Sequence, residues 1–583
     1  MGIFNTAQRV VAALAICNGV QASHEVSLPG YGRFVGTTIS QTLTNKALPA
    51  TVDAWLGIDF ASQPVGEARF APVGPPAAFD GVKNATQYGL SCVQDPETLP
   101  YEQGEACLSM NVFRPQNVSA DAKLPILLWI YGGAFVTGSS RSFDGPSFVA
   151  NAKEPLIVVT FNYRVNSLGF LPTPAFERLG LLNLGLRDQE TLFKFVQQYI
   201  SAFGGDPRRV TIGGRSAGAH SVGIHLFHNY NKTASASPYF SQAILQSGSV
   251  TARSFPNASY PLYQAQFTRY LSLIGCNATA NTTDTQLLSC LRSTPISAIQ
   301  KASTTLYNDS KYSITWPFQP TLGGPLLEQR GSLSGSNQQF YPIPIITTNV
   351  PDEAKFYSPG NLTTNDHFTS FLHTLLPGLT PTDLDDLSTL YPDPAAPNTT
   401  TTTTINNTPY DYSPNSTQYN RISAALTDYM YICPGQETAL RMSNAHSPHA
   451  SHVYKLVFAT NNTFPPWQGI PHTADTKYTW VEPYSSNRTI GVQYPDVGAL
   501  LHAYFANFVG SGDPNLGVGT RRLREEGRWV PVWPGYRDEV GEGREGLQVV
   551  IRPFGESGVE SDGRRRLQCE WWRDEGRAAR LEK

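Results

Sequence analysis

The chain has 583 residues, of which 40% are apolar and only 15% charged, and its formal net charge at pH 7 is −3. A chain of this length and composition can bury a large core. It lacks the excess of basic residues that marks nucleic-acid-binding proteins, so we exclude that class.

The first 22 residues are typical of a secretory signal peptide. Arg9 precedes the apolar run from Val10 to Cys17, and Val20-Gln21-Ala22 has the small-x-small pattern of a cleavage site. A buried first helix is the alternative. No later stretch reaches the roughly 18 apolar residues of a membrane span. We therefore expect a secreted protein with a signal peptide at 1–22, one domain at 23–583 and no membrane span.

The cysteines agree with export. Six remain once Cys17 has left with the signal peptide, and an even number is typical of an oxidising compartment. Six cysteines allow 15 pairings. Proximity along the chain suggests the pairs Cys92–Cys107 and Cys276–Cys290, which leaves Cys433–Cys569. The absence of any C-x-x-C spacing argues against a metal site.

Polar segments suggest a glycosylated surface. Thirteen Asn-x-Ser/Thr sequons follow the signal peptide, and several lie in polar stretches, at Asn277, Asn281, Asn398, Asn406 and Asn415. We therefore expect N-linked glycans. The threonine-rich segment 397–414 predicts a solvated loop. The region from Arg521 onward is rich in Arg and Glu and predicts a solvated charged face.

Strand and helix patterns alternate through the middle of the chain. The runs 124–130, 156–161 and 210–213 read as buried strands, and residues 188–200 carry apolar side chains at helical spacing. This alternation predicts an α/β fold with a large, mostly parallel central sheet flanked by helices. The active site of such a sheet lies at the carboxyl ends of its strands.

Residues 214–218, Gly-Arg-Ser-Ala-Gly, fit the pattern G-x-S-x-G. The pattern alone is weak because glycine and serine are common. Here it follows a strand and opens a helix, which is the context that exposes a serine oxygen on a strained turn. Ser216 is therefore the predicted nucleophile of a serine hydrolase. An ordinary glycine-rich connection is the alternative.

A second motif supports this chemistry. Residues 131–135, Tyr-Gly-Gly-Ala-Phe, directly follow the strand 124–130. A serine hydrolase needs backbone N–H groups that stabilise the tetrahedral oxyanion. One comes from the residue after the nucleophile, here Ala217, and the others from a glycine-rich loop after an earlier strand.

With these motifs the chain resembles the type-B carboxylesterase family, which includes cholinesterases and certain secreted lipases. The resemblance covers about residues 30 to 570 and rests on further segments such as 60–70, 105–112, 203–207, 246–248 and 511–515. It implies an α/β-hydrolase fold, small-molecule ester substrates, and hydrolysis through an acyl-enzyme without a metal or organic cofactor. It also implies the three disulfides above, and Gly133, Ala134 and Ala217 as the oxyanion donors.

The acid and the base follow the nucleophile in this fold. A strand pattern at 343–349 leads into Pro351-Asp352-Glu353. The family has Asp-Glu-Gly there, so the resemblance implies Glu353 as the acid, although Ala354 replaces the glycine. Asp352 is the second candidate, and its structural role would be a helix N-cap.

His472 is the predicted base among eleven histidines. It lies in a turn after the strand pattern 453–458, where the family has His-Gly-x-Glu and this chain has His-Thr-Ala-Asp. His502 lies in an apolar helix and is expected to be a core residue. The spacing of His446, His449 and His452 suggests a metal site, but Pro448 interrupts the helix that would align them.

Three functions fit these motifs. A carboxylesterase for small soluble esters fits best, because all three triad residues are present and only 14 residues separate Cys92 from Cys107, too few for a large lid. A lipase acting on longer acyl glycerides is the second. A non-catalytic adhesion module is the third, but such family members typically lack a triad residue.

Arg215 departs from the family, which usually has Glu or Gln before the nucleophile. An arginine stays charged at any working pH. Without a partner it should disfavour cationic alcohols and attract carboxylates, which makes it a candidate for substrate specificity. Alternatively, it points into the protein and forms a structural salt bridge.

Overall fold

The computed structural model describes residues 24–228, 230, 237, 239–276, 279, 281–310, 316–396, 404–405, 408–409, 414–445, 452–461, 464–480, 494–537 and 546–583. The signal peptide expected at 1–22 and most of the threonine-rich segment 397–414 lie outside these residues.

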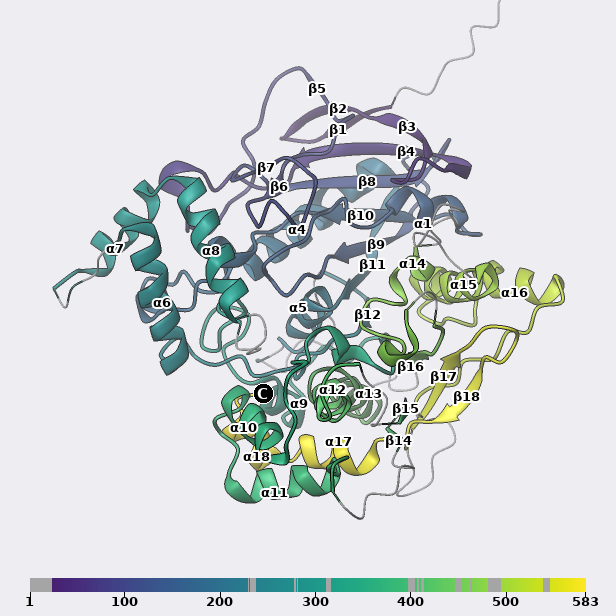
Figure 1. The fold of residues 1–583 in the computed structure, drawn as a ribbon. Helices are drawn as coiled ribbons and strands as arrows, with labels where there is room; N and C mark the ends of the chain where they lie inside the picture. The colour runs from purple at the N-terminus through teal and green to yellow at the C-terminus, as the bar shows by residue number, and fades with distance from the viewer. Residues whose placement is uncertain are drawn as a thin grey trace, which may run out of the picture.

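Eleven strands form the central sheet, in the order β18-β17-β16-β13-β12-β11-β9-β10-β8-β4-β3 (Figure 1). The strands from β17 to β10 in this order run parallel to one another: β17 (Leu547–Ile551), β16 (Val453–Phe458), β13 (Ile345–Asn349), β12 (Gln242–Gln246), β11 (Gly205–Arg215), β9 (Leu124–Ile130) and β10 (Ile157–Phe161). The outer strands pair antiparallel: β18 (Gly558–Ser561), β8 (Ser109–Pro115), β4 (Ala47–Asp59) and β3 (Thr37–Gln41).

The apolar runs in the sequence explain why the central strands are buried on both faces. Every residue of β10 and β13 is buried, as is every residue of β9 except Leu124. Strands covered on both sides need such continuous apolar runs, since neither face meets water. The expected α/β fold with a large, mostly parallel sheet is therefore confirmed.

Helices cover both faces of this sheet. In Figure 1, α4 (Leu184–Tyr199) and α5 (Ala217–Leu226) lie to the left of the strands, and α1 (Gly145–Asn151) and α15 (Pro495–Ser511) lie to the right. Both α5 and α15 contact β9 and β11. The helix expected at 188–200 thus begins earlier, at Leu184, and ends at Tyr199.

The remaining elements surround this core. The helices are α2 (Asn166–Gly169), α3 (Pro174–Arg178), α6 (Pro261–Ile274), α7 (Asp284–Ser293), α8 (Ile296–Ser310), α9 (Gly331–Ser336), α10 (Asn365–Leu375), α11 (Pro381–Leu390), α12 (Tyr419–Thr427), α13 (Cys433–Ser443), α14 (Thr476–Thr479), α16 (Val518–Glu525), α17 (Arg566–Trp572) and α18 (Glu575–Arg580). The short strands are β1 (Glu25–Leu28), β2 (Gly32–Val35), β5 (Val82–Asn84), β6 (Ser91–Cys92), β7 (Gln103–Gly104), β14 (Thr404–Ile405) and β15 (Thr408–Pro409).

All three expected disulfides are present, namely Cys92–Cys107, Cys276–Cys290 and Cys433–Cys569. The third joins α13 to α17, which are 136 residues apart at the bonded cysteines. It therefore fixes the C-terminal region to the helices beside β13 and β16.

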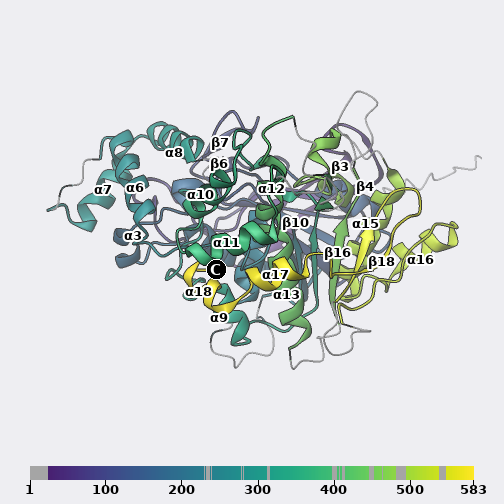
Figure 2. The same ribbon diagram turned by 60° about the horizontal axis from the view of Figure 1, so that its bottom comes forward.

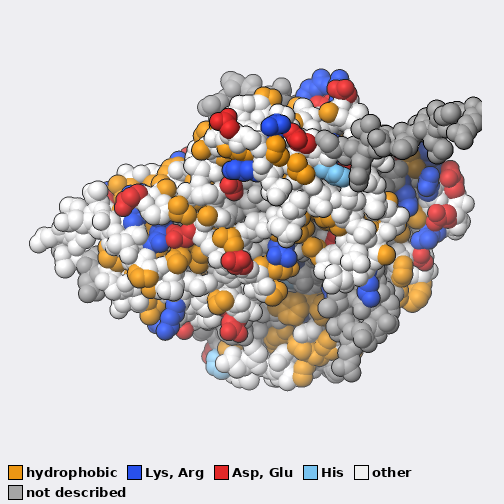
Figure 3. Space-filling view, turned by 90° about the horizontal axis from the view of Figure 1, so that it is seen from above, with side chains coloured by type: hydrophobic (Ala, Val, Ile, Leu, Met, Phe, Trp, Pro, Cys, Tyr) orange, Lys and Arg blue, Asp and Glu red, His pale blue; other side chains and the backbone are white. Residues whose placement is uncertain are grey.

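Charged side chains of both signs are scattered over the molecular surface. In the view from above, Lys and Arg alternate with Asp and Glu, and hydrophobic side chains lie among them (Figure 3). No field of a single sign covers this face, in keeping with the small net charge of −3.

The C-terminal region departs from the solvated charged face expected from Arg521 onward. Arg521 is exposed, but Arg565 is buried and its Nε donates to Asp428 at 3.0 Å. Helices α17 and α18 lie beside α11 (Figure 2). The expectation of a solvated charged face was wrong around Arg565. The sequence pattern does not reveal that its acidic partner, Asp428, lies more than 100 residues away in the chain.

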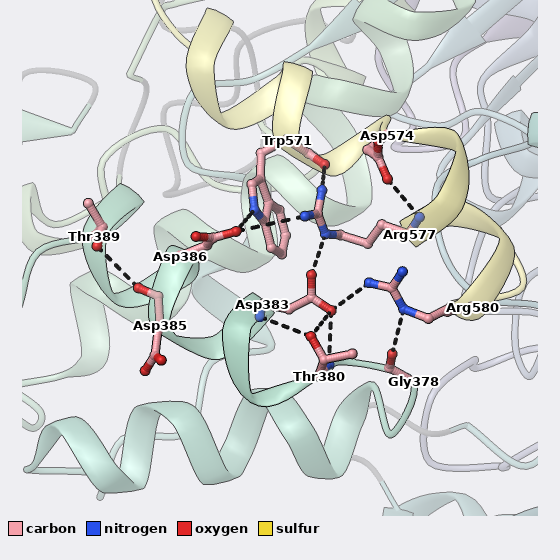
Figure 4. Close-up of polar contacts among 10 residues, drawn as sticks. All are labelled: Gly378, Thr380, Asp383, Asp385, Asp386, Thr389, Trp571, Asp574, Arg577 and Arg580. Carbon is pink, nitrogen blue, oxygen red and sulfur yellow. Dashed lines mark hydrogen bonds and ion pairs between the residues drawn. The ribbon is translucent and has the colours of Figure 1, made fainter.

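Asp383 links α11 to α18 (Figure 4). Its carboxylate accepts hydrogen bonds from Nε of Arg577 (2.9 Å), Nη2 of Arg580 (2.6 Å), and the N–H (2.8 Å) and Oγ1 (2.9 Å) of Thr380. Burial by itself would raise the pKa of Asp383, but these donors outweigh it and hold the pKa well below its ordinary value.

We expect Asp383→Asn to lower the free energy of unfolding at pH 7 by about 3 kcal/mol, since it removes the nearer and more buried of the two carboxylates that pair with the largely buried Arg577. The contribution of Asp383 is complete above the unfolded-state pKa of about 3.9 and is lost as pH falls below it, so the difference should shrink between about pH 4 and pH 2. Urea unfolding at both ends of this range measures it.

Asp386→Asn on the same helix is the matched control. Asp386 is about half-exposed and accepts from Nε1 of Trp571 at 2.9 Å, with Arg577 3.9 Å away. Its loss should cost less than about 1 kcal/mol. Equal destabilisation by the two substitutions at pH 7 would contradict the role assigned to Asp383.

Candidate active site

Ser216 lies on the tight turn between β11 and α5. Its backbone has φ 57° and ψ −124°, a conformation that side-chain-bearing residues rarely adopt and that costs of order 1–3 kcal/mol. The flanking glycines make the turn possible. A Cβ on Gly214 would lie 2.5 Å from the carbonyl group of Gly218, and one on Gly218 would lie 2.0 Å from the carbonyl oxygen of Ile130.

The glycine-rich loop after β9 packs against this turn. A Cβ on Gly132 would lie 2.4 Å from the carbonyl oxygen of Arg215 and 3.0 Å from Cβ of Ser216. Gly133 and Ala134 both have positive φ, 117° and 56°. Within the described part of the chain, no acceptor binds the N–H groups of Gly133, Ala134 or Ala217. The three expected oxyanion donors are therefore free to bind an oxygen.

Neighbouring side chains hold the loop in place. The hydroxyl of Tyr131 donates to the carbonyl oxygen of Tyr163 (2.7 Å), and that of Tyr163 donates to the carbonyl oxygen of Tyr131 (2.8 Å). Gln94, two residues after the first disulfide, binds both the N–H (2.7 Å) and the carbonyl oxygen (2.9 Å) of Gly138. The segment between Cys92 and Cys107 is thus hydrogen-bonded to the chain that directly follows the glycine-rich loop.

Glu353 is completely buried just beyond β13. Its Oε1 accepts from the Oγ–H of Ser247 (2.7 Å) and the N–H of Val350 (2.9 Å). Its Oε2 accepts from Nδ1 of His472. An ionised carboxylate can accept hydrogen bonds but cannot donate them. This contact therefore places the imidazole proton on Nδ1.

His472 is buried between two tyrosines. The ring centroids of Tyr431 and Tyr357 lie 4.8 Å and 5.9 Å from that of the imidazole. Nδ1 is bound to Glu353, whereas Nε2 has no hydrogen-bond partner among the described residues. The imidazole is thus oriented on one side and able to accept a proton on the other.

Asp352, the second candidate for the acid, does not contact His472 through its carboxylate. Oδ2 accepts from the N–H of Ile470 (3.0 Å), and the N–H of Asp352 donates to the carbonyl oxygen of Ile470 (3.2 Å). The side chain makes no helix-capping bond, so the expected N-cap role was wrong. Burial raises the pKa of Asp352, and the Lys355 ammonium opposes the rise. Asp352 instead anchors the loop that carries His472.

The other histidines are placed as follows. His502 is buried in α15, its Nε2 lies 3.1 Å from the carbonyl oxygen of Phe148, and burial lowers its pKa to about 3. It is a core residue, as expected. His446 and His449 lie outside the described residues, which leaves the metal-site alternative untested.

Sequence reasoning missed the supporting residues. Ser247, which holds Glu353, lies in a segment that the resemblance marked without a role. His220 follows Ser216 by one helical turn, and its Nδ1 accepts from the N–H of Ser249 (3.3 Å). Burial lowers the pKa of His220 well below its ordinary value, so it stays neutral. Spacing of four residues on one helix face is the signal that could have identified His220.

Asp475, which is buried, and Arg215, which is partly buried, are two further charged residues near Glu353. Oδ2 of Asp475 accepts from Nε2 of Gln246 at 2.7 Å, and Gln246 also donates to Thr479 at 2.8 Å. Burial raises the pKa of Asp475 to about 6, and the nearby Arg215 charge opposes this rise. Arg215 makes no hydrogen bond through Nε or Nη1 within the described chain, and so lacks the structural salt bridge considered above at those atoms.

A family model described as the carboxylesterase family matches residues 22–542. The chain belongs to the carboxylesterase family. Secreted lipase 4 of Gibberella zeae is 52% identical over 96% of this chain and 94% of its own length. Lipase 1 of Geotrichum candidum is 29% identical, covering 86% and 89%, and the acetylcholinesterase of Bungarus fasciatus is 30% identical, covering 84% and 80%.

The fold agrees with this family. The crystal structure of Aspergillus niger EstA is similar with a TM-score of 0.79 and 25% identity, covering 96% of this chain and 99% of that one. The carboxylesterase chain therefore has the α/β-hydrolase fold that the sequence resemblance implied, and by family it is an ester hydrolase. No helix among the described residues is long and apolar enough to cross a membrane.

We expect Asp352→Ala to lower kcat for a short-chain ester about tenfold, because it frees the loop before His472. Asp352→Asn keeps an oxygen that can accept from Ile470, so its kcat should fall less than about threefold. Steady-state kinetics of the two variants measure this difference. A loss in Asp352→Asn as large as that in Glu353→Gln would instead make Asp352 part of the triad.

Proposed function

We propose that this chain is a secreted serine carboxylesterase that cleaves small soluble carboxylic esters through an acyl-enzyme on Ser216. One observation carries the proposal: the imidazole of His472 is bound by the buried Glu353 through Nδ1 and leaves Nε2 unpaired, at the same edge of the sheet as the strained Ser216. A strained serine at the same edge of the sheet as such a base fits the arrangement that activates a hydroxyl for attack.

In the proposed mechanism, Nε2 of His472 takes the proton of Ser216 as Oγ attacks the ester carbonyl. Glu353 stabilises the imidazolium cation that forms. The N–H groups of Gly133, Ala134 and Ala217 bind the oxyanion. His472 then gives its proton to the leaving alcohol. Water, deprotonated by His472, attacks the acyl-enzyme and releases the acid and the free serine.

A lipase acting on longer acyl glycerides is the second candidate, because a relative 52% identical to this chain is named a secreted lipase. Small esters are favoured by the first disulfide loop. Its cysteines are 15 residues apart, β6 pairs with β7, and Gln94 accepts a hydrogen bond from the N–H of Gly138. The loop is therefore short and held against the candidate site, and it does not form a large lid of the kind expected in a lipase. Rates with tributyrin below and above its solubility limit separate the two, since a lipase accelerates at the interface.

Export and glycosylation belong to the same proposal. A signal peptide at 1–22, three disulfides and relatives named as secreted lipases support a secreted protein carrying N-linked glycans. We also propose one domain at 23–583, since the strands of a single sheet come from Thr37 to Ser561. Mass spectrometry of the secreted protein before and after deglycosylation tests the processing and the glycans.

We expect a fluorophosphonate probe to label the wild-type protein and to leave Ser216→Ala unlabelled. Turnover of a short-chain ester should fall by about six orders of magnitude in Ser216→Ala and His472→Ala, and by about four in Glu353→Gln. His502→Ala is the control, because that residue lies in the core away from the triad. Equal labelling of wild type and Ser216→Ala, or turnover that survives in His472→Ala, would overturn the assignment.

A further inference from the structure

Arg215 presents an unpaired cation beside the proposed triad. It is the last residue of β11, directly before Ser216. Nε and Nη1 are buried without a hydrogen-bond partner in the part of the chain that the structure describes. The residue as a whole is only partly buried, and Nη2 is not among the buried unpaired atoms, so Nη2 is the guanidinium nitrogen that a substrate group can reach.

The groups that surround Arg215 are those of the active site. Asp475, Tyr357, Glu353 and Tyr431 all lie within electrostatic range of its guanidinium. The two tyrosines also flank the ring of His472. On another side, the ring centroid of Phe143 lies 5.8 Å from Cζ of Arg215. The arginine therefore shares its aromatic surroundings with the proposed catalytic base.

Neither neighbouring carboxylate pairs directly with Arg215. Glu353 uses its two oxygens on Ser247, Val350 and His472. Asp475 uses Oδ2 on Gln246, and its Oδ1 makes no hydrogen bond among the described residues. Asp475 therefore compensates the charge of Arg215 from a distance but does not satisfy its N–H groups.

A buried cation without a direct partner is costly, and a guanidinium cannot escape that cost by losing its proton under working conditions. Its planar N–H groups match the geometry of a carboxylate. In surroundings of low polarity, such a pair is stronger than in water. These requirements define the missing partner as an anionic group with carboxylate geometry.

We propose that Arg215 binds a free carboxylate of the substrate, so that the enzyme favours esters carrying a carboxylate over uncharged esters of the same size. This inference rests on the proposed ester hydrolysis at Ser216, because it places the carboxylate next to the reacting ester. The carboxylate can belong to the acyl or to the alcohol part. The chemistry at the ester bond is unchanged.

The test compares charged esters with their uncharged carboxamide isosteres. Ethyl hydrogen succinate against ethyl succinamate places the charge on the acyl part, and 4-acetoxybenzoate against 4-acetoxybenzamide places it on the alcohol part. We expect wild type to have the higher kcat/KM for the charged member of at least one pair at pH 7.5. In Arg215→Gln this ratio should fall about tenfold to one hundredfold, the range that one charge-assisted hydrogen bond supplies. Arg215→Lys should restore part of it.

Two further variants separate a local contact from general charge effects. Arg208→Gln removes the same charge from an exposed side chain, 80% accessible, and should leave the ratio unchanged. Asp475→Asn removes the distant negative charge and should raise the ratio, since a substrate carboxylate then meets less repulsion.

A wild-type ratio of one or less in both pairs overturns the proposal, and this result needs no variant to fold. An unchanged ratio in a folded Arg215→Gln, judged by its thermal unfolding, also overturns it. Failure of wild type to hydrolyse any of the four esters and to react with the fluorophosphonate probe would instead refute the proposed function itself.

Discussion

Parallel pairing of β11, β12, β13 and β16 is the constraint on which the candidate site depends. Arg215 is in register with Gln246, Gln246 with Thr348, and Thr348 with Leu456. The strands therefore end at one edge, and the turns that follow them meet there. Ser216, Ser247 and Glu353 come from consecutive strand ends, and the longer connection after β16 returns His472 to the same place.

Close backbone packing at this edge holds Ser216 in its strained conformation. The turn at Ser216 is strained, and it persists because Gly214 and Gly218 allow the backbones of β9 and α5 to approach it. Gly132 brings the loop after β9 against the same turn. The strained serine and the loop with its free N–H groups therefore depend on the same feature. The backbones approach so closely that a side chain at these glycines would clash with them.

Glu353 on the one hand, and Arg215 with Asp475 on the other, differ in how their charges are paired. Both carboxylate oxygens of Glu353 accept hydrogen bonds from groups of the protein, namely Ser247, Val350 and His472. Arg215 and Asp475 interact electrostatically without a direct hydrogen bond, and among the described residues two nitrogens of Arg215 and one oxygen of Asp475 have no partner. Buried polar groups normally have a hydrogen-bond partner, so unpaired ones next to the candidate triad require an explanation. This contrast agrees with the proposed role of Glu353 in the triad and with the proposed role of Arg215 in substrate binding.

The sequence by itself determined the parallel sheet, the three disulfides and the candidates for the triad. Apolar strand runs, the spacing of Cys92–Cys107 and Cys276–Cys290 and the glycine motif around Ser216 are local signals. The pair Cys433–Cys569 followed by elimination, and family resemblance ordered the remaining residues. Tertiary structure distinguishes Glu353 from Asp352, which are adjacent in sequence but have different partners because one turns toward His472 and the other toward Ile470. It also decided the contacts of Ser247 and Asp383 and the surroundings of Arg215, because these depend on residues far away in the chain, which no local pattern records.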